Sequence, residues 1–178
     1  SAQAQTLKLD YRFDEPNGPD GWIPAGGGPA LTVAHDFSGN GRDGVYDDGG
    51  GNHTYIGGQD SAFPTLGTAV RTDQPWATGL LLNGSGVSFM NALVQDFSIG
   101  LWIKPGAVAQ DVRLICSNVN WSLDLLADGS LRLKIGPLDL ATDYDVAAGI
   151  TDANKWYHIG FTLAADQTLK FYVDGAQV

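Results

Sequence analysis

Residues 154–175 read NKWYHIGFTLAADQTLKFYVDG, and this stretch predicts a β-hairpin. Its two arms, residues 155–163 and 168–173, are rich in β-branched and aromatic residues, which favour strands. The short segment 164–167 supplies the turn between them. A hairpin at this place predicts an antiparallel sheet, and the preceding segments extend the same pattern.

Short strands also precede the hairpin, and we expect them at residues 79–83, 87–89, 97–103, 113–116, 121–126 and 131–135. Asp128-Gly129 is a strong turn signal between the last two of these strands. No window repeats its apolar residues every 3.6 positions, and we find no linker or internal repeat. The sequence therefore predicts one all-β domain over residues 1–178, with the fold of an antiparallel β-sandwich.

The first half of the chain carries weaker strand signals. In residues 7–13, apolar and aromatic residues alternate with polar ones, which predicts a half-buried strand. Residues 14–77 are rich in Gly, Asp and Pro, and they contain only weak strand signals. So long an irregular stretch inside a compact domain usually carries function.

Residues 36–47, DFSGNGRDGVYD, have the spacing of a calcium-binding loop. Side-chain oxygens occur at alternate positions, in Asp36, Ser38 and Asn40. The glycine that follows permits a sharp reversal of the chain, and Asp47 supplies a carboxylate at the twelfth position. A hard cation prefers such a set of oxygen ligands. Neither flank has a helical pattern, so the loop belongs to a scaffold other than a pair of helices.

Two features of this calcium hypothesis stay open at the level of sequence. The Arg42 carbonyl is expected as a further ligand, and either Asp43 or Asp47 completes the set. The alternative is a tight Asx-type turn, in which Asp36 and Asn40 bond their own backbone and no metal is needed.

Composition and charge exclude several classes of partner. The net charge is −10 and the isoelectric point lies near 4.3, which argues against nucleic acid or an anionic membrane as partner. Nineteen acidic residues are Asp and one is Glu15, a balance that favours loops and turns over helices. Cys116 is the single cysteine, so no internal disulfide forms, and its apolar segment predicts a buried thiol.

The start of the chain indicates export. Ala2-Gln3-Ala4 followed by Gln5 matches the small-x-small end of a signal peptide, whose apolar core would already have been removed. No stretch is long enough to span a bilayer. We therefore expect a secreted, extracellular protein without membrane insertion.

The order of these segments resembles the laminin-G-like, concanavalin A-like lectin/glucanase jelly-roll family. The matching segments are the D-x-S-G-N-G-x-x-G loop at 36–44, the strands at 79–84 and 97–105, the hairpin at 125–135 and the specific motif at 154–175. The resemblance covers nearly the whole chain apart from a loop-rich insertion at about 45–78. It implies a jelly-roll sandwich in which calcium is a structural cofactor.

One departure from the family pattern concerns the end of the chain. In the family, the Tyr-Val-Asp-Gly turn is followed by further strands, whereas this sequence stops at Val178. The strands at 7–13 and 168–173 would then each have an open edge. Either the sequence is a piece of a longer chain, or another protein chain supplies the missing strands at the open sheet edge.

The aromatic residues divide into two groups. Trp102, Trp156 and His158 lie on expected strands, where core packing is the expectation and sugar stacking the alternative. The remaining three tryptophans are expected to be exposed and are candidates for ligand binding: Trp22, Trp76 and Trp121. A loop tryptophan that covers the edge of the core is the alternative for these.

The sequence offers no catalytic constellation. Glycosidases of this fold use two carboxylates, usually glutamates on one strand, and this chain has only Glu15. Asp143 and Asp145 lie in an expected solvated loop, and the three histidines lack zinc spacing. We therefore expect a protein that is not an enzyme.

These observations together predict a secreted, calcium-binding recognition or adhesion module. The resemblance implies a lectin-like domain whose partner is a glycan or a glycoprotein surface. Two alternatives stay open. One is a structural subunit of an extracellular assembly completed by strand donation, and the other is an accessory carbohydrate-binding module of a larger hydrolase.

Overall fold

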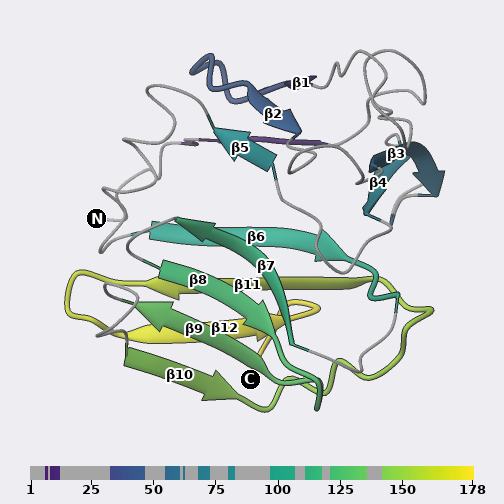
Figure 1. The fold of residues 1–178 in the computed structure, drawn as a ribbon. Coiled ribbons are helices and arrows are strands. Elements are labelled where there is room, and N and C mark those ends of the chain that lie inside the picture. Colours follow the sequence, from purple (N-terminus) through teal and green to yellow (C-terminus); the bar gives the residue numbers. More distant parts are fainter. Residues whose placement is uncertain are drawn as a thin grey trace. The chain divides into compact units, whose positions relative to one another are not determined.

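The computed structural model describes residues 7, 9–12, 33–46, 55–60, 62, 68–72, 80–82, 97–106, 111–117, 121–135 and 142–178 (Figure 1). Every strand pairing in these ranges is antiparallel, and no helix occurs in them. The chain divides into two units, residues 1–87 and 88–178. Each unit is described below by itself, and the prediction of a single domain stays a prediction.

The second unit contains two four-stranded sheets. One has the order β10-β9-β8-β7, formed by Val112–Ser117 (β7), Trp121–Leu125 (β8), Leu131–Ile135 (β9) and Thr142–Val146 (β10). The other has the order β13-β12-β11-β6, formed by Phe97–Ile103 (β6), Tyr157–Leu163 (β11), Leu169–Val173 (β12) and Ala176–Gln177 (β13). The expected strands at 97–103 and 131–135 are confirmed with their bounds.

Turn chemistry fixes the two hairpins that the sequence predicts. Between β8 and β9, Gly129 adopts a φ of +81° and its amide donates to the Leu126 carbonyl at 2.9 Å. Asp128 accepts a bond from the Ser130 amide at 2.9 Å, which closes an Asx turn. Between β11 and β12, the Ala164 amide donates to the Thr168 carbonyl at 3.0 Å. Both predicted hairpins are confirmed.

Aromatic rings join the inner faces of the two sheets. Trp121 of β8 lies 6.1 Å from Phe161 of β11 and 5.9 Å from Phe97 of β6, measured between ring centroids. Phe161 also contacts Phe97 at 5.4 Å and Phe171 of β12 at 6.4 Å. Because the two Trp121 contacts cross from one sheet to the other, the unit is a β-sandwich, as the sequence predicts.

Two tryptophan predictions are wrong. Trp121, expected to be exposed, is 3 % exposed, because it shares the inner side of β8 with Leu123 and Leu125. Trp102, expected in the core, is 44 % exposed, because the alternation of β6 places Phe97 inward and Trp102 outward. The pairing of these strands thus reverses the expected roles of the two indoles.

Two smaller predictions about the second unit are also wrong. Residues 142–146, expected in a loop, form strand β10, because Asp143 and Asp145 face Lys134 and Arg132 of β9 across the strand pair. Cys116, expected to be buried, is exposed. Its neighbour Ile115 pairs with the buried Leu123, so the alternation of β7 turns the thiol outward.

A short strand covers part of the sheet edge that we expected to be open. β13 pairs with Tyr172 and Val173 of β12, and the Val178 amide donates to the Phe171 carbonyl at 3.0 Å. Leu169 and Lys170 have no strand partner on that side within the described ranges. A partner chain at this edge stays a prediction.

The first unit contains a three-stranded sheet of order β1-β2-β5, formed by Val33–Ala34 (β1), Gly44–Tyr46 (β2) and Leu80–Leu82 (β5). Tyr55–Asp60 (β3) and Thr68–Thr72 (β4) form a separate antiparallel pair, so the insertion at about 45–78 contains paired strands. No helix of the described residues is long and apolar enough to cross a membrane.

The N-terminal strand prediction is wrong over the residues that the structure describes. Of residues 7 and 9–12, Tyr11 alone is in a β-pairing, a single antiparallel bridge to Asp36. The segment is held by side chains of the loop at 36–43 instead of a strand ladder. The expected strand at 87–89 lies outside the described residues.

Candidate functional site

The loop that follows β1 is organised around the carboxylate of Asp36. Its oxygens accept bonds from the amides of Asp10 at 3.1 Å, Ser38 at 2.9 Å and Arg42 at 3.0 Å. Burial raises the pKa of Asp36, but these hydrogen bonds outweigh it and lower the pKa to about 2. The carboxylate therefore stays ionised and gathers three backbone amides from two segments.

The other side chains of the loop tie it to residues 7–11. The Asn40 amide group donates to Ser38 Oγ at 2.8 Å and to the Leu7 carbonyl at 3.1 Å. The Tyr11 hydroxyl donates to the Arg42 carbonyl, and burial raises its pKa. Together with the Asp36 bonds, these contacts form an Asx-type turn, which is the alternative that the sequence left open.

The expected metal ligands share this loop, and several of their oxygens accept bonds from protein donors. Asp43 accepts a bond from the Asp36 amide at 2.8 Å and lies 3.6 Å from His35 Nδ1, and the Arg42 carbonyl is bonded by Tyr11. No group of three acidic, His or Cys residues within the described ranges is placed to hold a metal. Asp47 lies outside those ranges. The donor types suit calcium, and the calcium site stays a prediction.

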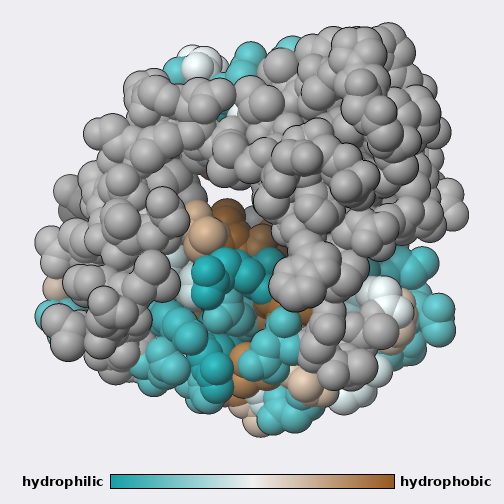
Figure 2. Space-filling view, viewed as in Figure 1, coloured by the Kyte–Doolittle hydropathy of each residue, from teal (hydrophilic) through white to brown (hydrophobic). Residues whose placement is uncertain are grey.

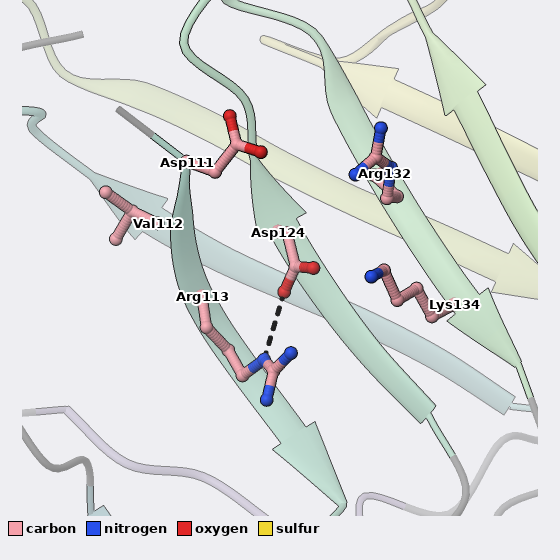
Figure 3. Close-up of a pocket in the computed structure, with 6 residues that line it drawn as sticks. All are labelled: Asp111, Val112, Arg113, Asp124, Arg132 and Lys134. Atoms are coloured by element: carbon pink, nitrogen blue, oxygen red, sulfur yellow. Dashed lines mark hydrogen bonds and ion pairs between the residues drawn. The ribbon is translucent and has the colours of Figure 1, made fainter. Parts of the chain in front are cut away.

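A polar groove of about 270 Å³ lies over β7, β8 and β9 (Figure 3). It is lined by Asp111, Val112, Arg113, Asp124, Arg132 and Lys134. Asp124 occupies the centre, its side chain only 10 % exposed, and Arg113 Nε donates to its Oδ1 at 3.2 Å. At one end, Asp111 accepts a bond from the Ala127 amide at 3.0 Å.

Neighbouring ion pairs hold the side chains of the groove in place. Arg132 donates to both oxygens of Asp145, at 2.7 and 3.0 Å, and these bonds lower the pKa of Asp145. Hydrophilic residues gather over this part of the sheet in Figure 2. Sequence reasoning missed the groove, although the alternation of β8 and β9 sets Asp124, Arg132 and Lys134 apart from the buried leucines.

The other sheet has an aromatic pair on its outer side. Trp102 of β6 pairs with His158 of β11, and their ring centroids are 5.0 Å apart. A Cβ on the neighbouring Gly100 would lie 3.2 Å from His158 Nε2, so glycine gives the imidazole its space. The alternation of FSIGLWI in β6 groups Trp102 with Ser98 and Gly100, and this is the signal that could have identified the outer side from the sequence.

We define the Trp102 face as the outer side of β6, β11 and β12. Its cross-strand rows are Trp102 and His158, then Gly100, Gly160 and Tyr172, then Ser98, Thr162 and Lys170. At one end, Asp174 accepts bonds from the His158 amide at 2.9 Å and from the Lys155 ammonium at 2.8 Å. The bond from Lys155 holds the pKa of Asp174 below its usual value.

Comparison with known protein families matches residues 82–178 to the concanavalin A-like lectin/glucanases superfamily. The chain belongs to this superfamily. The match covers more than half of the 178 residues and includes both sheets of the second unit. No curated protein and no solved structure matches the chain.

Membership of the superfamily fits the sandwich and points to carbohydrate binding or a related role. The superfamily includes lectins and glucanases by its description, so membership alone does not decide between binding and catalysis. Of the three tryptophans expected to bind ligand, Trp121 is in the core, and Trp22 and Trp76 lie outside the described residues. The exposed indole on a described sheet face is that of Trp102.

Proposed function

We propose that this chain is a secreted, non-catalytic carbohydrate-recognition module that binds a saccharide on the Trp102 face. The observation that carries the proposal is the exposed indole of Trp102, 44 % accessible and set against His158 on the outer side of a rigid sheet. A large apolar ring on the surface of a sandwich has an energetic cost in water, which a ligand that covers it removes.

The chemistry of a pyranose ring matches this face. One face of the sugar consists mainly of C–H groups, which stack on an indole, while its rim of hydroxyls requires hydrogen-bond partners. The neighbouring rows of the Trp102 face supply such partners in Ser98, Thr162, Tyr172 and Lys170. Because these groups stand on paired strands, their spacing is fixed before a ligand arrives.

The non-catalytic part of the proposal rests on the state of the described carboxylates. Asp174 is bonded by Lys155, Asp145 by Arg132 and Asp124 by Arg113. A glycosidase needs one carboxyl group that is protonated at neutral pH and a second that is ionised. Hydrogen bonds from Lys155 and Arg132 lower the pKa of Asp174 and of Asp145 respectively, which opposes the role of a general acid for these two groups.

Replacing Trp102 by alanine is expected to weaken saccharide binding by at least about tenfold, because an exposed indole at the centre of a contact contributes about 2 kcal/mol or more. The measurement is titration calorimetry with neutral oligosaccharides. Tyr144, which is 43 % exposed on the other sheet, provides the matched control. The Tyr144→Ala variant keeps its affinity. Equal affinity in the Trp102→Ala variant and the wild type would overturn the proposal.

We further propose that calcium orders the loop at 36–47 and so supports the fold. In the Asp36→Ala variant, three amides lose their acceptor, which is expected to cost about 2–3 kcal/mol of unfolding free energy. The same change is expected to abolish the rise in melting temperature that calcium gives the wild type. Asp166→Ala, which opens another Asx turn, is the control and retains that rise.

The pH dependence of the same loop provides a second measurement. The pKa of Asp36 is lowered from 3.8 to about 2 in the folded protein, so its contribution to stability is fully present above pH 3.8 and is lost as pH falls towards 2. The Asp36→Ala variant lacks this loss in acid unfolding.

A wild type that melts identically in calcium and in chelator would overturn the calcium part of the proposal. The Asx turn around Asp36 would be unaffected by that result.

A further inference from the structure

We propose that the polar groove over β7, β8 and β9 is a second saccharide site, which makes the module bivalent. The inference rests on the proposed function. A second site adds to the proposed function, because the groove and the Trp102 face lie on opposite outer sides of the sandwich and each would bind its own sugar chain.

The register of the strands places the groove on the outer side. Leu123 pairs with Leu133, and both are fully buried in the core. Asp124 pairs with Arg132 one position along, and Arg113 pairs with Asp124 from β7. Successive residues of a strand point to opposite sides of the sheet. These charged side chains therefore point away from the core, and the sheet that contains Trp102 lies on the far side of that core.

The charges of the groove favour a neutral, hydroxyl-rich ligand. Its lining contains three cations and two carboxylates, and the adjacent Asp145 neutralises Arg132. A carboxylate accepts bonds from sugar hydroxyls, and guanidinium and ammonium groups donate to them. A site with both kinds of group matches hydroxyls, which both donate and accept. A fully charged ligand would meet a like charge on one side.

The construction of the groove also indicates a binding site. The Arg113–Asp124 pair sets the orientation of a nearly buried carboxylate before any ligand arrives, which lowers the entropy cost of binding. The Lys134 ammonium forms no ion pair within the described ranges, so it keeps donors for a ligand. A volume of about 270 Å³ is just below the range for drug-sized ligands, so the groove suits one or two sugar units.

Two sites that face opposite ways have a consequence for function. Different glycan chains would occupy them, so one module would bridge two chains or bind a branched surface with increased avidity. A module with the Trp102 face alone would bind a single chain.

The test is titration calorimetry of the full chain with a panel of neutral hexasaccharides built from glucose, mannose, xylose or galactose. The wild type is expected to bind two molecules of an accepted hexasaccharide. Trp102→Ala is expected to keep the groove site alone, and Lys134→Ala is expected to weaken the groove site at least fivefold and to leave the Trp102 face unchanged. Lys104→Ala, the same change at an exposed lysine outside the groove, is the control and keeps the groove site.

A second variant guards against a folding artefact. The double change Arg113→Met with Asp124→Leu removes both charges together, so no buried charge is left unpaired, and it is expected to abolish the groove site while the fold is kept. One bound molecule, lost in Trp102→Ala and unaffected by both groove variants, would overturn this inference and leave the proposed function intact. If one molecule binds and is lost only in the groove variants, the proposal of a saccharide site on the Trp102 face is overturned. If no hexasaccharide of the panel binds, both saccharide sites are overturned.

Discussion

Replacing Trp121 by alanine is expected to lower the free energy of unfolding by about 3–5 kcal/mol. The indole is 3 % exposed and touches Phe97 and Phe161 of the opposite sheet, so its loss leaves a cavity where the two sheets meet. The surrounding rings belong to paired strands and move little to fill the space. Chemical denaturation of the purified chain measures the effect.

The matched control is Trp102→Ala, which removes the same side chain from the outer face of β6. Its expected cost is within about 1 kcal/mol, because little cavity forms where solvent already reaches the ring. Equal losses of stability in the two variants would contradict the sandwich register described here, since one indole would then not face inward and the other outward.

Replacing Gly129 by alanine is expected to lower the free energy of unfolding by about 2–4 kcal/mol. The residue has a φ of +81°, which disfavours any side chain, and an added Cβ would lie 2.6 Å from the Ile150 carbonyl oxygen. Ile150 is fully buried and its amide donates to the Gly129 carbonyl at 3.1 Å, so the neighbouring segment cannot move away without loss of this bond.

Gly149 separates the two causes of this cost. Its φ is +66°, but an added Cβ would meet nothing within 4 Å, so Gly149→Ala is expected to cost only the backbone term, about 1 kcal/mol. Thermal and denaturant unfolding of the two variants, compared with the wild type, give the difference. A loss at Gly149 as large as that at Gly129 would show that the close contact with Ile150 contributes nothing.

Much of the second unit was predictable because its signals are local. Asp128-Gly129 determines its own turn through φ, and the alternation of β-branched and aromatic residues identifies β6, β9, β11 and β12. Strand β10 was missed because its polar TDYDV sequence resembles a loop when read alone. Its charges become favourable only beside Arg132 and Lys134 of β9.

The two tryptophan errors have a physical cause. Residue type and flanking residues suggested where Trp102 and Trp121 lie, whereas strand alternation assigns Trp102 to the side of Ser98 and Gly100, and Trp121 to the side of Leu123. The signal was present in the sequence. To use this signal, one must first determine which side of each strand faces the core. The apolar residues of β6 and β8 identify that side.

By itself, the sequence determined the all-β class, the two hairpins of the second unit and the oxygen-rich loop around Asp36, because turns and alternation depend on neighbouring residues. Only the tertiary structure decided that His158 lies against Trp102, that Arg113 and Lys134 meet around Asp124, and that the Asp36 carboxylate holds amides of two distant segments. These contacts depend on the register between strands and on loop closure, and residues far apart in the chain set both.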